Sequence, residues 1–241
     1  MSAKVNNSPA PKTHERVLII NSVSVFVCCV IIYRWRTDEM LTRVKFCGLT
    51  RISDIEAVNE LKPEYIGFVF WQKSKRNIIP DEAKKLKDML NESTKAVGVF
   101  VDEDIEVIKK ISDEDIIDVI QLHGKENEEY IKSIKRVTGK TVIKAFKINS
   151  DKDIIKANTS IADYVLLDAG MGQGKTFDWK LIKGMKRPYF LAGGLDLNNV
   201  EDAVINLEPF AVDVSSGIET EGKKDYEKMK SFLDIVRCDQ S

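Results

Sequence analysis

The feature of this sequence that most limits its fold is a regular alternation of two kinds of segment from residue 41 onward. Short runs rich in β-branched residues alternate with amphipathic stretches of helical spacing, at about 25 residues per unit. This alternation predicts βαβ units and a parallel sheet. Eight such units in about 200 residues reach the lower size limit of a (β/α)8 barrel. The sequence therefore predicts an α/β fold with a single TIM barrel.

The expected elements are placed by the same pattern. The expected strands are residues 44–46, 65–70, 95–100, 118–121, 141–146, 164–167, 189–192 and 211–214, and the expected helices are residues 53–61, 81–90, 104–111, 127–137, 151–158, 179–183, 198–207 and 224–236. Ser53 and Asn198 are expected to cap their helices, since each precedes an apolar helical face. The alternative is an open doubly wound sheet. That fold needs fewer strands, and no glycine-rich dinucleotide motif follows the first strand.

Residues 1–40 differ in composition from the rest, and we expect them to form an extension outside a barrel of residues 41–241. Residues 1–12 are polar and proline-containing, which is typical of disorder. Residues 17–33 form a nearly unbroken apolar run, at the short limit of the roughly 20 residues that span a bilayer. Three interpretations remain open for this run: a membrane anchor, a targeting segment, or a translation start assigned too far upstream. In the third case Met40 is a natural start.

Composition disfavours several functional classes. Hydrophobic residues make up 43% and charged residues 31% of the chain, which is ordinary for a soluble globular protein. The formal net charge of -1 gives no sign of a nucleic-acid partner. The four cysteines lack C-x-x-C spacing, which disfavours a disulfide framework or a zinc site, and no cluster of histidines or carboxylates indicates another metal. A reducing, cytoplasmic location fits these cysteines best, with membrane attachment through residues 17–33 as the alternative.

Chemically active side chains follow the ends of the expected strands. In a parallel barrel these ends share one rim, and that rim carries the active sites of such barrels. Cys47 ends the first strand and Asp168 directly follows the sixth. We interpret Cys47 as a base, because a modest depression from a thiol pKa of about 8.5 gives a useful thiolate, and Asp168 as a partly desolvated acid. The alternative for such a cysteine is a small buried apolar residue.

Small residues after the last two strands predict a phosphate site. The residues are Gly193, Gly194, Ser215, Ser216 and Gly217. Backbone N–H groups in such loops bind anions, and the loops after strands seven and eight are the usual phosphate cradle of these barrels. The alternative is a pair of ordinary tight turns, in which glycine supplies a positive φ.

Two further rim residues have both a functional and a structural interpretation. Arg76 follows the second strand, where its planar guanidinium is suited to clamp a substrate carboxylate, or it is a solvated loop charge. His123 follows the fourth strand and either contacts the ligand or is a hydrogen-bonded structural residue.

Eight short motifs, in this order, carry a resemblance to a known enzyme family. They are KFCGLT at 45–50, IGFVF at 66–70, SKR at 74–76, QLHG at 121–124, LD at 167–168, GQGKTFDW at 172–179, LAGGL at 191–195 and VDVSSGIE at 212–219. The chain from about Met40 to Arg237 resembles the phosphoribosylanthranilate isomerases, (β/α)8-barrel enzymes of tryptophan biosynthesis. It departs from them in having Lys75 where the family usually has Pro, Met171 where Gly is frequent, and one residue fewer after Glu219.

The resemblance implies an Amadori rearrangement of N-(5-phosphoribosyl)anthranilate to an aminodeoxyribulose phosphate, without a cofactor. Asp168 would be the general acid that opens the sugar ring, and Cys47 the general base that takes the proton from C2. Arg76 would hold the anthranilate carboxylate, the loops after strands seven and eight would hold the phosphate, and Asp213 would bind sugar or order the rim. The implied partner is this small-molecule substrate, and we expect a monomer or a homodimer.

Two other kinds of function compete with this one. The first is another enzyme on a phosphate-binding barrel. Indole-glycerol-phosphate synthase would need a rim lysine as acid and a longer N-terminal helix, and the related histidine-pathway isomerase relies on two aspartates rather than on a residue such as Cys47. The second is a non-catalytic phosphate-binding or membrane-tethered scaffold. A scaffold does not need both Cys47 and Asp168.

Overall fold

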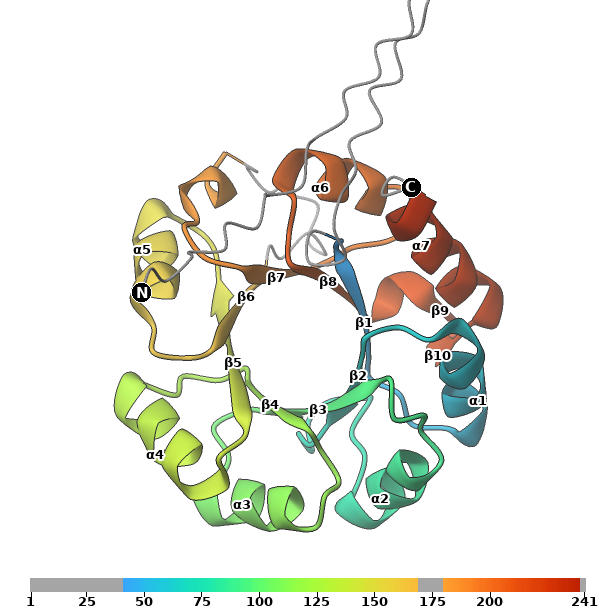
Figure 1. Ribbon diagram of the computed structural model, residues 1–241, viewed down its shortest axis with the longest axis horizontal. Helices are drawn as coiled ribbons and strands as arrows, with labels where there is room; N and C mark the ends of the chain where they lie inside the picture. The colour runs from blue at the N-terminus through green and yellow to red at the C-terminus, as the bar shows by residue number, and fades with distance from the viewer. Residues whose placement is uncertain (1–40, 169–179, 239–241) are drawn as a thin grey trace, which may run out of the picture. The chain divides into compact units, whose positions relative to one another are not determined.

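Eight parallel strands close into a barrel in sequence order (Figure 1). The computed structural model describes residues 41–168 and 180–238 of the chain. The strands are β1 (Arg43–Cys47), β2 (Tyr65–Val69), β3 (Lys95–Phe100), β4 (Val119–Leu122), β5 (Thr141–Lys147), β6 (Tyr164–Asp168), β7 (Tyr189–Ala192) and β8 (Ala211–Val214). Pairing of β8 with β1, in a register that sets Lys45 beside Asp213, closes the ring. The predicted TIM barrel is confirmed, and the open doubly wound sheet is excluded.

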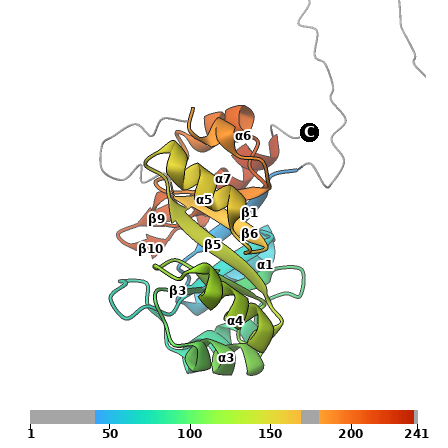
Figure 2. The same cartoon turned by 90° about the vertical axis from the view of Figure 1, so that its left-hand side faces the viewer.

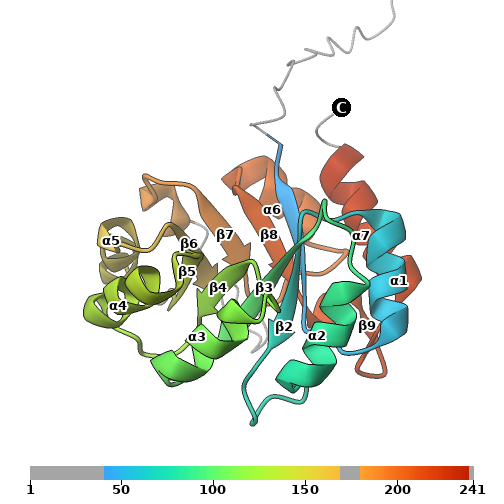
Figure 3. The same cartoon turned by 60° about the horizontal axis from the view of Figure 1, so that its bottom comes forward.

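The helices form a ring outside the strands. They are α1 (Ile52–Leu61), α2 (Pro80–Asp88), α3 (Ile105–Asp113), α4 (Glu128–Thr138), α5 (Asp151–Thr159), α6 (Val200–Leu207) and α7 (Tyr226–Cys238). Figure 2 shows α3 beside α4, and Figure 3 shows α7 beside α1, where the last unit meets the first. Each of these helices overlaps an expected one.

The connection from β6 to β7 differs from the prediction. Its described part holds a single 3-10 turn, η3 (Ile182–Gly184), where an α-helix over residues 179–183 was expected. This turn ends at Gly184, and Pro188 follows four residues later; both residues are poor continuations of a helix. Residues 169–179, which include Met171 and Trp179, lie outside the described residues.

The two predicted helix caps are wrong by one or two residues. Helix α1 begins after Arg51 instead of Ser53, because the carboxylate of Asp54 accepts hydrogen bonds from the backbone N–H groups of Thr50 and Arg51, both at 3.0 Å. Helix α6 begins after Asn199. The side-chain oxygen of Asn199 accepts a hydrogen bond from the Asp196 N–H at 2.9 Å and so fixes the turn that enters the helix.

A small hairpin occupies the connection from β8 to α7. A 3-10 turn, η4 (Ser216–Ile218), leads into the antiparallel strands β9 (Glu219–Thr220) and β10 (Lys223–Lys224). The two turn residues have φ of 52° at Glu221 and 78° at Gly222, the backbone of a type I′ turn. Helix α7 therefore begins at Tyr226 instead of residue 224, since Lys224 pairs in the hairpin.

Alternation along the strands builds two cores. Side chains on the outer face, such as Phe46 and Ile66, are buried beneath the helices. Inside the barrel, the Phe190 ring packs against Tyr65 and Tyr164 with ring centroids 5.4 and 5.8 Å apart. These residues lie at or next to the first residues of their strands. The inner core thus fills the end where strands begin and leaves space at the end where they finish.

Within the described residues, no helix is long and apolar enough to cross a membrane. The expected extension of residues 1–40, including the apolar run at residues 17–33, lies outside the described part of the chain.

Candidate active site

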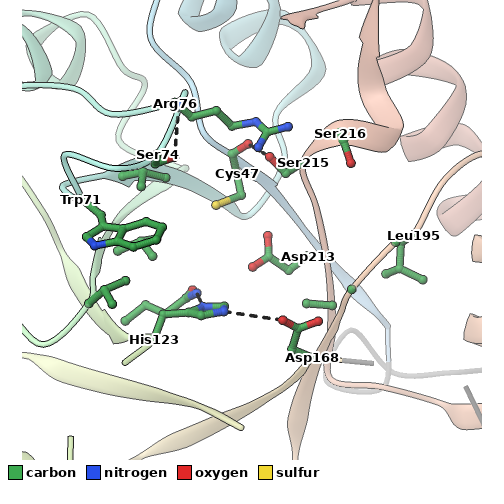
Figure 4. A pocket seen from close by; sticks show the side chains of 17 residues that line it. Cys47, Trp71, Ser74, Arg76, His123, Asp168, Leu195, Asp213, Ser215 and Ser216 are labelled. Atoms are coloured by element: carbon green, nitrogen blue, oxygen red, sulfur yellow. Dashed lines mark hydrogen bonds and ion pairs between the residues drawn. The ribbon is translucent and has the colours of Figure 1, made fainter. Parts of the chain in front are cut away.

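A pocket of about 310 Å³ opens at the carboxyl ends of the strands (Figure 4). Nine of the residues singled out from the sequence line it: Cys47, Arg76, His123, Asp168, Gly193, Gly194, Asp213, Ser215 and Ser216. They come from six different strand ends. Their meeting follows from the parallel barrel, in which all strands finish at the same rim. A substrate of drug-like size fits a pocket of this volume.

Cys47 is the last residue of β1, and its thiol points into the pocket (Figure 4). It pairs in register with Gly67 of β2, and a Cβ atom built on Gly67 would lie only 2.7 Å from the Cys47 Sγ. Glycine at this position therefore provides the space that the thiol occupies. Burial raises the pKa of the Cys47 thiol against the opposing charges of Lys45 and Lys224. This direction is opposite to the modest depression expected from the sequence.

Asp168 is the last residue of β6 and enters the pocket from another side (Figure 4). Its carboxylate Oδ2 lies 3.7 Å from Nε2 of His123, which follows β4. The other ring nitrogen of His123, Nδ1, lies 3.1 Å from the side-chain nitrogen of Gln121. About a third of each side chain of the Asp168–His123 pair is exposed, so both polar groups are within reach of a ligand.

Asp213 is buried on β8 and forms an ion pair that the sequence did not reveal. Its Oδ2 lies 2.7 Å from Nζ of Lys45, which is fully buried on β1. Its second oxygen, Oδ1, is buried with no hydrogen-bond partner among the described residues, and the same holds for Oε1 of Gln121. Both residues line the pocket. Two buried acceptors in one pocket suit a ligand with hydroxyl groups, because unpaired buried oxygens are costly.

Arg76 is already paired across the rim. Its Nε and Nη2 donate to the two carboxylate oxygens of Glu219 at 2.6 and 2.8 Å, a bidentate contact. Lys224 donates to the same carboxylate at 2.8 Å and to the Ser215 carbonyl at 2.9 Å. A guanidinium has five N–H donors, so Arg76 keeps donors for a ligand while Glu219 fixes its plane. Glu219 and Lys224 were not selected from the sequence, although Glu219 ends one of the quoted motifs.

The charges around Glu219 change its titration. Burial alone would raise the pKa of the Glu219 carboxyl, but the hydrogen bonds and charges of Arg76 and Lys224 outweigh burial and lower that pKa to about 2. The carboxylate is therefore ionised throughout the neutral range. It also raises the pKa of the Arg76 guanidinium.

The loops after β7 and β8 lie against each other at the pocket wall. Gly193 and Gly194 have φ of 93° and 75°. Gly217 does not line the pocket; it lies behind the wall, where an added Cβ would be 2.1 Å from the Leu195 carbonyl oxygen. The hydroxyl of Ser215 donates to the Cys47 carbonyl at 2.9 Å. The Ser215 hydroxyl therefore ties the last loop to β1. The Ser216 hydroxyl makes no hydrogen bond within the described part of the chain, and Ser216 lines the pocket.

Within residues 41–168 and 180–238, no group of three or more His, Cys, Asp or Glu side chains is arranged to hold a metal ion.

Comparison with known proteins gives one consistent result. The model of the family described as N-(5'phosphoribosyl)anthranilate (PRA) isomerase matches residues 44–235. The N-(5'-phosphoribosyl)anthranilate isomerase of Thermoanaerobacter pseudethanolicus is 47% identical over 204 residues, covering 82% of this chain and 98% of the relative.

Solved structures agree with this match. A crystal structure of phosphoribosyl anthranilate isomerase in complex with reduced 1-(o-carboxyphenylamino)-1-deoxyribulose 5-phosphate superposes with a TM-score of 0.72 at 35% identity, covering 82% of this chain and all of that one. A structure of mutually generated monomers of the dimeric Thermotoga maritima enzyme gives a TM-score of 0.73 at 36% identity with the same coverage.

The lowered pKa of Glu219 makes stability depend on pH in a predictable direction. Because its folded-state pKa of about 2 lies below the ordinary glutamate value of 4.5, ionised Glu219 stabilises the fold above pH 4.5, and this contribution is lost as pH falls toward 2. Glu219→Gln should therefore lower the free energy of unfolding at pH 7 by about 1–2 kcal/mol, after allowance for solvent screening. The difference from wild type should shrink on acidification.

Urea unfolding of both proteins between pH 7 and pH 3 measures this difference. Glu82→Gln removes a carboxylate from an exposed pair with Lys85 and serves as the matched control, for which little change is expected at any pH. A Glu219→Gln difference that stays constant over the whole pH range would contradict the assignment.

Proposed function

The chain belongs to the family of N-(5'-phosphoribosyl)anthranilate isomerases, and we propose that Cys47 and Asp168 are the base and the acid of its reaction. The protein converts N-(5'-phosphoribosyl)anthranilate into 1-(2-carboxyphenylamino)-1-deoxyribulose 5-phosphate in tryptophan biosynthesis. The observation that carries the assignment of roles is that a thiol on β1 and a carboxyl on β6 open into one pocket. The reaction needs one group that gives a proton and one that takes a proton.

Asp168 acts first, as the general acid. In its protonated form it donates a proton to the ring oxygen of the substrate's furanose. The bond between C1 and that oxygen breaks, and the nitrogen lone pair forms a C=N bond, giving a protonated Schiff base. The Asp168 carboxylate left behind faces His123 at 3.7 Å, which supplies a polar neighbour for the new negative charge.

Cys47 acts second, as the general base. Its thiolate takes the proton from C2 of the Schiff base. The electron pair of the C2–H bond forms a C1=C2 bond, and the electrons of the C=N bond return to nitrogen. The resulting enolamine becomes the ketone when C1 gains a proton and the C2 hydroxyl loses one. C1 is reduced while C2 is oxidised within one molecule, so no external redox cofactor is needed.

The remaining rim residues bind the two ends of the substrate. We assign the phosphate to the loops after β7 and β8, through backbone N–H groups at Gly193, Gly194, Ser215 and Ser216 and the Ser216 hydroxyl. Gly217 supports this phosphate site from behind the wall, because its lack of a side chain lets the two loops approach closely. Arg76 holds the anthranilate carboxylate with the donors that Glu219 leaves available. Asp213 accepts a sugar hydroxyl through Oδ1, the buried oxygen without a partner among the described residues. His123 contacts the ligand beside Asp168.

Two variants test the acid and base roles. Cys47→Ala and Asp168→Asn should each lower kcat by at least about 10²-fold, the usual scale of general acid–base catalysis. Binding of a reduced product analogue should change much less, since the phosphate and carboxylate contacts lie elsewhere. Loss of turnover with little loss of binding identifies a group that acts in the transition state. Steady-state kinetics and calorimetric titration of each variant provide the two measurements.

The controls separate the roles from general damage. Cys238 is an exposed thiol on α7, and Cys238→Ala should retain wild-type turnover. Near-normal turnover in Cys47→Ala would remove the base assignment. If Asp168→Asn weakens analogue binding as much as it slows turnover, Asp168 positions the ligand and His123 becomes the next candidate for the acid.

We also propose that residues 1–40 are a separate extension and that the barrel and its activity need only residues 41–241. The enzyme works in the cytoplasm, as a monomer or a homodimer. The eight strands that close the barrel begin at Arg43, which supports this division. A chain that begins at Met40 should be soluble and as active as the full chain. Insoluble or inactive short protein would place the boundary elsewhere, and sedimentation of the full chain distinguishes the two oligomeric states.

A further inference from the structure

Lys45 takes no part in the acid and base steps, yet its charge is buried inside the barrel. Its exposed fraction is 0%, and its neighbours along the inner face are mostly apolar. Burial of an ammonium costs several kcal/mol unless paired groups offset the loss of water. On other strands, apolar residues such as Ile143 and Phe190 fill the inside of the barrel. The cation at residue 45 therefore calls for a functional reason.

The strand geometry places the Lys45 ammonium between a carboxylate and the thiol. Lys45 and Cys47 are two residues apart on β1, so both side chains point to the inside of the barrel. The pairing of β1 with β8 sets Lys45 beside Asp213, whose Oδ2 is 2.7 Å from the ammonium nitrogen. The charge of the Cys47 sulfur also interacts with that ammonium, since both side chains point to the same side of β1. Asp213, Lys45 and Cys47 thus form a continuous row of interacting groups, in which Asp213 and Cys47 line the pocket and Lys45 is fully buried.

Charged groups on several elements face the Cys47 sulfur. They are Lys45 on β1, Asp213 on β8, Lys224 on β10 and Arg76 after β2, with Asp168 and His123 across the pocket. Burial raises the pKa of the thiol most; Lys45 lowers it, Asp213 raises it and Lys224 lowers it. Of the cations, Lys45 opposes burial most strongly and is the one that no solvent reaches.

We propose that Lys45 is a positioning residue that acts through Cys47: its ammonium is the fixed counter-ion of the catalytic thiolate, and Asp213 holds the ammonium in place. This inference rests on the base role proposed for Cys47. A bound substrate displaces water from the pocket, which would otherwise stabilise a thiolate. A cation already buried beneath the sulfur keeps its effect when water leaves, and that effect grows in the drier site.

Two substitutions in the same ion pair distinguish this role from a structural one. Lys45→Met removes the positive charge and should raise the pH midpoint of Cys47 ionisation by about 1–3 units, the usual effect of a close opposite charge. Asp213→Asn removes a negative charge and leaves the ammonium to the thiol alone, so the midpoint should fall. A purely structural ion pair would move both midpoints in the same direction, since each variant breaks the same contact.

The readout is the rate at which iodoacetamide alkylates Cys47 in the full chain as a function of pH, followed on the Cys47 peptide by mass spectrometry. Cys238 is exposed and serves as an internal control whose midpoint should not move. If Lys45→Met does not fold, because Asp213 is left buried and unpaired, Lys45→Met/Asp213→Asn replaces it. Its midpoint should lie above that of Asp213→Asn.

Midpoints that shift in opposite directions support the inference. An unchanged midpoint in Lys45→Met, a shift of both single variants in one direction, or a double variant equal to Asp213→Asn would overturn it. Alkylation needs no substrate and no turnover. An active Cys47→Ala enzyme would therefore refute the base role of Cys47, whatever the midpoints of the other variants. If Cys47→Ala is inactive and the midpoints do not move, only the role of Lys45 is refuted.

Discussion

The ion pair between Lys45 and Asp213 joins the first and last strands where the barrel closes. A barrel closes only when the final strand pairs with the first in one register, and here that register brings two buried charges to 2.7 Å. A shift of β8 by one residue would turn Asp213 out of the barrel and leave the buried charge of Lys45 without its partner. The contact that fixes the closure therefore also fixes the floor of the pocket beneath Cys47.

The remaining site follows from that closure. Because all strands run parallel, Cys47 and Asp168 reach one pocket from β1 and β6 without any loop having to carry them. An ion pair positions the loop residues of the site. Arg76, which follows β2, donates two hydrogen bonds of 2.6 and 2.8 Å to the carboxylate of Glu219, which follows β8. The site thus places the groups for proton transfer on strands and the groups for ligand binding on loops that the Arg76–Glu219 ion pair connects.

Sequence reasoning predicted the barrel and the rim residues because both depend on local patterns. Strand and helix periodicity repeats along the chain, and Cys47 and Asp168 stand where strands end. Sequence reasoning missed the ion pairs of the rim, because their partners are far apart in the chain. Lys45 and Asp213 are 168 positions apart, and Arg76 and Glu219 are 143 positions apart. No local pattern reports such contacts. The lysine between Val44 and Phe46 on β1 was the available signal. The direction predicted for the pKa shift of Cys47 was wrong for the same reason, since burial by residues distant in the chain decides that direction.

A crystal structure of this protein with the reduced product analogue bound tests the arrangement most directly. The account predicts phosphate against the loops after β7 and β8, the carboxylate on Arg76, and C2 about 3–3.5 Å from the Cys47 Sγ, near enough for proton transfer. The oxygen released by ring opening should face Asp168. An analogue bound in the reverse direction, with its phosphate on Arg76, or with C2 turned away from Cys47, would contradict the account.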